Sequence, residues 1–119
     1  MRIFKVQKEE AKHVTHFGSK FLLNPVISSD GEIKTSLITL EAHGIIGFHQ
    51  TAVPQLMMVL SGEGKVCGEN RVYKPVQKGH VVYWGKGEWH ETLSETGMTA
   101  LVVEGPALKE NDIHTNFSN

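Results

Sequence analysis

The chain has 119 residues, of which 39% are hydrophobic and 21% are charged. This length and composition fit one domain with a single core, and they argue against a chain that is disordered as a whole. The 12 basic and 13 acidic residues give a formal net charge of -1 and include no long basic run, so the charge does not favour binding to nucleic acid.

The N-terminal segment and the cysteine content indicate the cellular compartment in which the protein is expected. Residues 1–10 contain no apolar run that would form a signal peptide, and no stretch of the chain is long and apolar enough to span a bilayer. The single cysteine, Cys67, cannot form an internal disulfide, and a small buried residue is favoured over a nucleophile there. We therefore expect a soluble, cytoplasmic protein that does not bind membranes.

Short apolar segments rich in β-branched residues alternate with turns along the whole chain. The expected strands cover residues 2–6, 20–27, 33–41, 45–51, 55–60, 65–67, 71–76, 81–84, 90–93 and 98–104. Residues 2–6 are expected to form an edge strand, and residues 8–16 a helical turn or a loop. The absence of a helical period predicts an all-β domain, either a sandwich or a barrel, over residues 1–106, followed by a polar tail over residues 107–119.

The turn signals predict which strands pair. Asp30-Gly31, between two apolar runs, predicts a hairpin, and residues 52–54 form a short hairpin connection. Residues 61–64 predict a further turn.

Three polar side chains are predicted to converge on one point. His49 and Thr51 share one face of a strand, and the connection over residues 52–54 would place Gln55 opposite Thr51, while His90 would come from another strand. Two imidazoles and one amide oxygen can bind a divalent metal ion and leave positions open for water or substrate. Because none of these ligands is charged, the ion would be a strong Lewis acid that is weakly retained. From spacing alone, surface or hydrogen-bonded histidines remain the commoner explanation.

Residues 44–62 resemble the first motif of the cupin superfamily. In that motif a glycine precedes a His-x-His pair, a glutamate and a second glycine. Here Gly44 leads to His49 after four residues rather than five, Thr51 stands in place of the second histidine, Gln55 in place of the glutamate, and Gly62 matches.

Residues 79–94 resemble the second cupin motif. Gly79, Gly87 and His90 match it at the correct offsets, whereas Gly85 replaces the proline and Ser94 replaces the asparagine. The resemblance, which covers residues 44–94, implies a small jelly-roll β-barrel, the double-stranded β-helix of RmlC-like cupins, that is usually dimeric and holds a metal or small-molecule site inside. It also implies metal ligands at His49, Gln55 and His90, with Zn, Ni, Fe or Mn as the ion, while Thr51 is a poor ligand whose hydroxyl could hold a metal-bound water.

Several other side chains are candidates for a place near the site. Met57 has the parity of Gln55 and would line the cavity or fill the core, and Trp84 is expected in the core. Tyr83 and Glu104 are the candidates for a general base, although an exposed carboxylate is the simpler interpretation of Glu104. The remaining histidines are expected at the surface: His13, His16, His43, His80 and His114.

Three functions are compatible with these features. The first is a metal-dependent enzyme of oxygenase, isomerase or lyase type that acts on a small molecule. The second is a non-catalytic cupin that binds or senses a small molecule, with or without metal, in which His49, Gln55 and His90 hydrogen-bond to one another or to water. The third is a structural dimer with a vestigial site. Because cupins are usually dimeric and edge strands need cover, the resemblance implies a homodimer.

Overall fold

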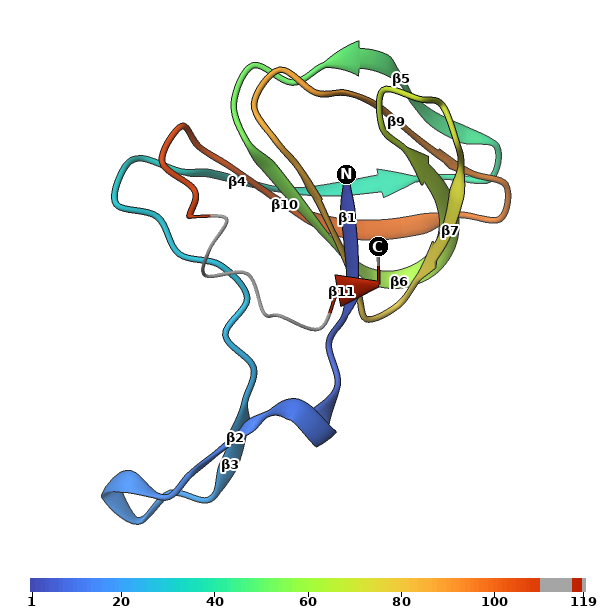
Figure 1. The fold of residues 1–119 in the computed structure, drawn as a ribbon. Coiled ribbons are helices and arrows are strands. Elements are labelled where there is room, and N and C mark those ends of the chain that lie inside the picture. The colour runs from blue at the N-terminus through green and yellow to red at the C-terminus, as the bar shows by residue number, and fades with distance from the viewer. Residues whose placement is uncertain (110–116, 119) are drawn as a thin grey trace.

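The computed structural model describes residues 1–109 and 117–118 (Figure 1). Strands make up 56% of the residues that the structure describes, and the helices among them are two short 3-10 turns, η1 (Lys8–Glu10) and η2 (His16–Gly18). The predicted all-β class is therefore confirmed. Most of the predicted polar tail, including His114, lies outside the described residues. Within those residues, no helix is long and apolar enough to cross a membrane.

The strands follow one another with short connections. In chain order they are β1 (Arg2–Lys5), β2 (Lys12–Val14), β3 (Phe21–Leu23), β4 (Lys34–Leu40), β5 (Gly44–Gln50), β6 (Gln55–Cys67), β7 (Lys74–Gln77), β8 (His80–Trp84), β9 (Trp89–Ser94), β10 (Met98–Glu104) and β11 (Phe117–Ser118).

The long strand β6 belongs to two layers. Its first half lies in the order β11-β1-β8-β6-β10-β4, which we call the main sheet. Its second half pairs with β7 on one side and β9 on the other, and β9 pairs with β5; we call these strands the second sheet. The sheets are not closed, so the predicted jelly roll takes the form of a sandwich rather than a closed barrel.

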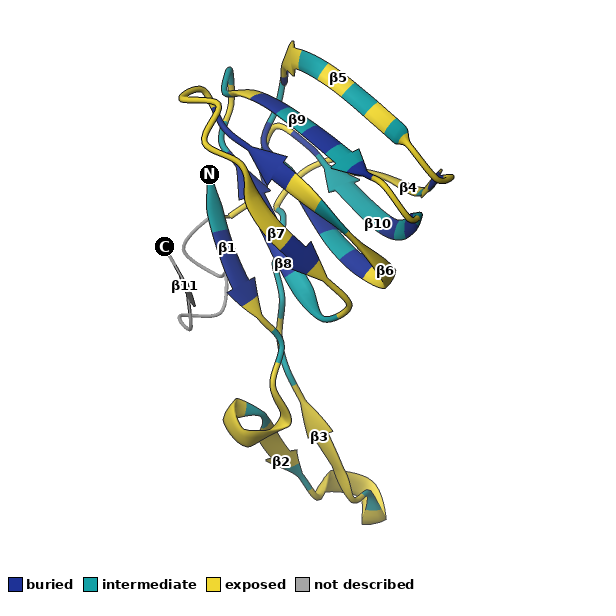
Figure 2. Cartoon of the chain, turned by 90° about the vertical axis from the view of Figure 1, so that its right-hand side faces the viewer, coloured by how far each residue is buried: buried dark blue, intermediate teal, exposed yellow. Residues whose placement is uncertain are grey.

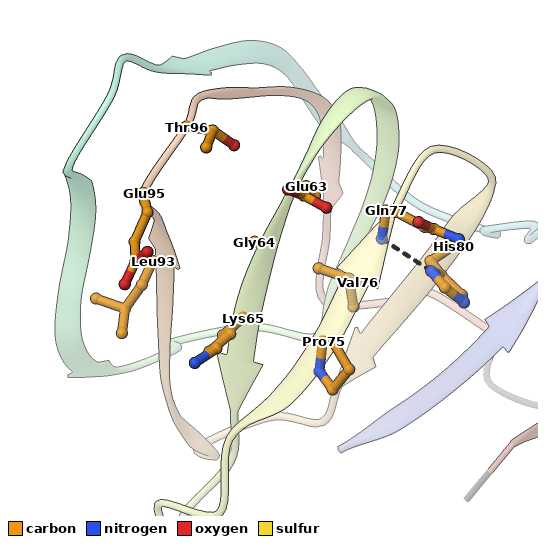
Figure 3. Close-up of a pocket in the computed structure, with 10 residues that line it drawn as sticks. All are labelled: Glu63, Gly64, Lys65, Pro75, Val76, Gln77, His80, Leu93, Glu95 and Thr96. Carbon is orange, nitrogen blue, oxygen red and sulfur yellow. Dashed lines mark hydrogen bonds between the residues drawn. The ribbon is translucent and has the colours of Figure 1, made fainter.

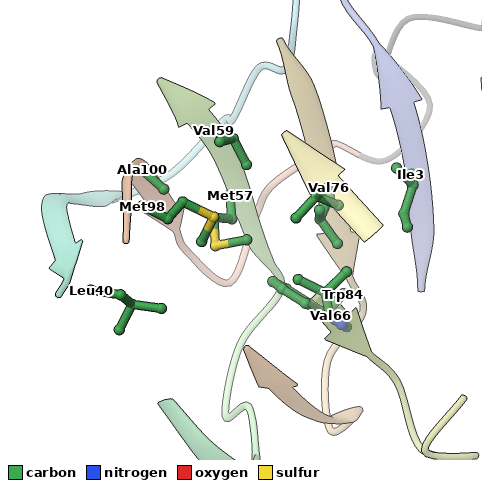
Figure 4. Packing of buried hydrophobic residues seen from close by; sticks show 10 residues of the cluster. Ile3, Leu40, Met57, Val59, Val66, Val76, Trp84, Met98 and Ala100 are labelled. Carbon is green, nitrogen blue, oxygen red and sulfur yellow. The ribbon is translucent and has the colours of Figure 1, made fainter. Parts of the chain in front are cut away.

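The core lies between the inner faces of the two sheets (Figures 2 and 4). Because side chains alternate along a strand, Met57, Val82 and Trp84 point inward, and all three are buried, as predicted for Met57 and Trp84. They pack with apolar residues from the other strands: Ile3, Leu40, Val59, Val66, Val76, Met98 and Ala100.

A smaller apolar cluster covers part of the outer face of the main sheet. It consists of Phe4, Leu56, Val81 and Tyr83, against which Val26 and Ile27 pack from the segment that precedes β4. Tyr83, a candidate for the general base, therefore points away from the space between the sheets.

The pairings predicted from the turn signals are wrong. Asp30-Gly31 does not join a hairpin, because β3 pairs with β2 and β4 pairs with β10. Likewise β5 pairs with β9, while the start of β6 pairs with β8 and β10. A turn signal shows only that the chain changes direction, and in this fold both connections carry the chain to a strand that is distant in sequence.

Residues 61–64 do not form the predicted turn, and residues 2–6 do not form the predicted edge. β6 runs through residues 61–64 with an irregularity opposite Thr99 and Ala100. β1 is flanked on both sides, by β8 and by β11. The edge prediction failed because β11 comes from the far end of the chain.

Residues 12–23 form a hairpin that we call the arm. The predicted strand over residues 20–27 shortens to β3, which pairs only with β2. β2 itself lies within residues 8–16, where a helical turn or a loop was expected. Both ribbon views show the arm projecting away from the sandwich (Figures 1 and 2).

A glycine with a left-handed backbone lies next to the irregularity in β6. Gly62 has a φ of +77°, and a Cβ built on it would lie 2.2 Å from the carbonyl oxygen of Gly97. We expect Gly62→Ala to lower the free energy of unfolding by about 2 kcal/mol, because it adds left-handed strain to a backbone clash. Gly85→Ala is the matched control, since a Cβ at Gly85 would meet no atom within 4 Å. Urea unfolding followed by circular dichroism measures both, and equal losses in the two variants would contradict the expectation.

Candidate functional site

The structure places the two motif histidines side by side. His49 on β5 and His90 on β9 are direct cross-strand partners, beyond a register shift in β5. Cross-strand partners share one face of a sheet, and the ring centroids lie 4.4 Å apart with planes tilted by 51°. His90 is 2% exposed, whereas His49 is exposed. Solvent therefore reaches the pair from the side of His49.

Both imidazoles are oriented by backbone carbonyl groups. Nδ1 of His49 lies 2.7 Å from the carbonyl oxygen of Gly47, and Nδ1 of His90 lies 3.4 Å from that of Glu88. Because a carbonyl oxygen can only accept a hydrogen bond, each Nδ1 carries the hydrogen. In the neutral ring Nε2 then keeps its lone pair, which is the arrangement of a histidine that binds metal through Nε2.

His90 is held between two rings. Its other neighbour is Trp84, whose ring centroid lies 4.6 Å away at a tilt of 32°. Trp84 is 0% exposed and donates a hydrogen bond of 3.1 Å from Nε1 to the carbonyl oxygen of Cys67. Burial lowers the pKa of His90 and His49 lowers it further, against opposing effects from the backbone and carboxylate of Glu88. The His90 ring is thus both immobilised and favoured in its neutral form.

Gln55 lies on the main sheet rather than opposite Thr51. Its cross-strand partners are Trp84 and Glu104, so these three side chains share the inner face. The Gln55 amide donates from Nε2 to Oε2 of Glu104 over 3.3 Å, which leaves the Gln55 carbonyl oxygen for another partner. Glu104 is half-buried, whereas an exposed carboxylate was the simpler expectation.

Thr51 is engaged in the connection between β5 and β6. It is buried, and its hydroxyl donates a hydrogen bond of 2.6 Å to the carbonyl oxygen of Val53. Its backbone N–H and carbonyl pair with Glu88 and Gly87. Thr51 therefore fixes the chain next to His49, and the hydrogen of its hydroxyl is already used.

His49, His90 and Gln55 carry no charge, so they would hold a cation only weakly. Within the described part of the chain, no three side chains drawn from His, Cys, Asp and Glu are arranged to hold a metal ion. An ion here would depend on the Nε2 atoms of His49 and His90, with the amide oxygen of Gln55 and water completing its coordination. The structure brings the two imidazoles together, and Gln55 lies on the main sheet beside Trp84.

A separate pocket lies away from the histidine pair (Figure 3). Its volume is about 490 Å³, and it opens between β6, β7 and β9. The pocket is lined by Glu63, Gly64, Lys65, Pro75, Val76, Gln77, His80, Leu93, Glu95 and Thr96. Sequence reasoning did not find it, because its residues come from four segments and form no motif.

The second sheet carries an aromatic stack that was also missed. Phe48 and Trp89 stack with centroids 5.4 Å apart, and the Arg71 guanidinium carbon lies 3.9 Å from the Phe48 ring centroid. Trp89 follows the alternation of β9 away from His90, so this stack does not line the histidine pair. Of the histidines expected at the surface, three are exposed: His13, His16 and His43.

Comparison with known proteins identifies the fold. No protein-family model matches the chain, and no curated protein matches its sequence. Among solved structures, an RmlC-like cupin from Shewanella frigidimarina NCIMB 400 is similar, with a TM-score of 0.60 and 19% identity over 90% of this chain and 93% of the other. An RmlC-like cupin from Desulfovibrio desulfuricans has a TM-score of 0.58 and 24% identity, covering 68% of this chain and 79% of the other. A cupin superfamily protein from Desulfitobacterium hafniense DCB-2 has a TM-score of 0.57 and 11% identity, covering 66% and 74%.

His80 should make stability depend on pH. Burial lowers its pKa below 6.5, and Lys5 lowers it further, against a smaller effect of the Gln77 backbone. The stability contributed by neutral His80 is therefore complete above pH 6.5 and is lost as pH falls through the folded-state pKa. We expect the urea midpoint to fall between about pH 7.5 and about pH 5.5 by more in the wild type than in His80→Gln. If the urea midpoint fell equally in the wild type and in His80→Gln, His80 would not be the origin of the pH dependence.

Proposed function

We propose that this chain, which has the cupin fold of the solved structures that resemble it, is a metal-dependent enzyme acting on a small molecule. His49, His90 and Gln55 would hold a divalent ion, with Zn, Ni, Fe and Mn as candidates. The observation that supports this most directly is that both rings direct Nδ1 to a backbone carbonyl, because each neutral ring then leaves Nε2 as a ligand.

The protein residues define how such a site would work. Trp84 fills the space behind His90 and keeps water from that side of the ring. His49 is exposed, so substrate would approach over its ring. Gln55 is oriented by Glu104, which turns the amide nitrogen away from any cation and leaves the carbonyl oxygen as the donor.

The reaction class would be that of an oxygenase, an isomerase or a lyase. A bound divalent ion would supply Lewis acidity, polarising an oxygen of the substrate. Glu104 is the carboxylate in contact with this set, and its Oε1 atom is the candidate acceptor for a substrate proton, since Oε2 faces Gln55. Tyr83 is a weaker candidate because it lies in the outer cluster.

The proposal predicts that metal binding requires both histidines. His49→Ala and His90→Ala should each weaken binding of Zn or Mn by about tenfold or more, because each removes one of two imidazole ligands. Titration calorimetry and elemental analysis after purification without chelator measure the effect. His43→Ala is the matched control, since His43 is an exposed histidine on the turn that precedes β5. Near-zero metal in the wild type would overturn the proposal, as would an equal loss in the control.

Gln55→Glu tests the third ligand. The new carboxylate would stand beside Glu104 without a cation, so the metal-free protein should be less stable than the wild type, and added metal should restore stability. A ΔTm on metal addition that is no larger in Gln55→Glu than in the wild type would remove Gln55 from the ligand set.

A second candidate is a cupin that binds a small molecule without metal or catalysis. It is favoured by the absence, among the described residues, of a three-member group of His, Cys, Asp and Glu. We expect this protein to gain thermal stability from a small polar ligand in the presence of EDTA, with the gain lost in Trp84→Leu or His90→Ala. A ligand shift that disappears on chelation would instead assign the site to the metal-dependent function.

A further inference from the structure

The pocket between β6, β7 and β9 lies on the outer face of the second sheet. Lys65 is the cross-strand partner of Pro75 on one side and of Leu93 on the other, so these three side chains share a face. The next residue, Val66, is 0% exposed and belongs to the core, so the Lys65 face is turned away from the core. His90 lies an odd number of residues before Leu93 on β9 and therefore belongs to the opposite face. The pocket is thus separate from the histidine pair.

The floor of the pocket is apolar, and its size suits a small molecule. Leu93 is half-buried and Pro75 is exposed. Ile45, the cross-strand partner of Leu93, is 57% exposed and extends the apolar row. The volume of about 490 Å³ falls within the range of about 300 to 1,000 Å³ that ligand sites occupy. A ligand with an aliphatic segment would therefore bury that segment against Leu93 and Pro75.

Three charged side chains that line the pocket have no partner in the described part of the chain. Among those residues, Glu63, Lys65 and Glu95 form no ion pair, and their side chains make no hydrogen bond. By contrast, Glu91, on the same face of β9, accepts a hydrogen bond from Tyr73. The pocket thus presents charges that a ligand can neutralise without breaking a contact within the protein.

The signs and positions of these charges specify the ligand. In Figure 3 the Lys65 ammonium and the Glu95 carboxylate are directed toward the β9 side of the pocket. Glu63 lies beside β7, because Gln77 is its cross-strand partner. His80 adds no charge at neutral pH, because burial lowers its pKa. One positive and two negative groups match a ligand with one anionic and two cationic groups, of which one cation lies next to the anion and the other lies apart.

We propose that this pocket binds a free basic amino acid, with its carboxylate at Lys65, its α-ammonium at Glu95 and its side-chain cation at Glu63. The aliphatic part of the ligand lies over the apolar floor. Each charged group of the ligand then meets the opposite charge, and none of the three protein charges is left without a counter-ion. Binding requires no metal at the histidine pair.

Titration calorimetry of the whole chain with L-lysine, in the presence of EDTA, tests the proposal. We expect one site per chain with a Kd below about 1 mM. L-Norleucine lacks the side-chain cation and cadaverine lacks the carboxylate, so each should bind more weakly by about tenfold or more. Equal affinity for the three compounds would overturn the proposal, as would the lack of saturable L-lysine binding up to about 10 mM.

Variants that remove single charges locate the contacts. Glu63→Gln should abolish the preference for L-lysine over L-norleucine, and Lys65→Met should abolish the preference over cadaverine, because each removes the counter-charge of the group that the analogue lacks. Glu95→Gln should weaken L-lysine binding by about tenfold or more. Lys74→Met is the matched control, since Lys74 is an exposed lysine of β7 that does not line the pocket, and it should leave the Kd unchanged. Binding that all three pocket variants leave unchanged, or that His90→Ala abolishes, would overturn the proposal.

Discussion

The packing of the two sheets depends on Trp84, which contacts both of them from inside the core. The residue belongs to β8 of the main sheet, yet its indole N–H bonds to the carbonyl of Cys67, at the end of the half of β6 that lies in the second sheet. Its ring lies against His90 of β9. Because an indole ring is large and rigid, it sets how closely β8 and β9 approach and holds the His90 imidazole in one place.

Strand β6 makes that arrangement possible. It pairs with β8 and β10 along its first half and with β7 and β9 along its second, and the irregularity near Gly62 separates the two halves. An irregularity of this kind bends and twists the strand that carries it. As a result Gln55, at the start of β6, shares the inner face with Trp84, while His49 and His90 come from the opposite layer. The proposed metal site would therefore draw its ligands from both layers of the sandwich.

The sequence was sufficient to predict the class of the fold and the histidine pair, but not the pairing of strands. Alternation located most strands, and the motif spacing identified His49 and His90 before their register was known. The predicted position of Gln55 was wrong, because the short connection over residues 52–54 was interpreted as a hairpin. The cross-strand neighbour of Gln55 is Trp84 rather than Thr51. The arm was missed for a related reason. Its apolar residues, such as Phe21, resemble those of a core strand, and local pattern does not reveal whether a strand packs against the core of the domain.

The two indoles of this chain stand in unlike surroundings. Trp84 is enclosed and touches an imidazole, whereas Trp89 is 41% exposed and stacks on Phe48. Their fluorescence should therefore separate, with a blue-shifted component from the enclosed indole and a red-shifted one from the solvated indole. Excited indoles are sensitive to a neighbouring charge, so the fluorescence of Trp84 on the main sheet would report the state of His90, and Trp89 on the second sheet would serve as an internal reference.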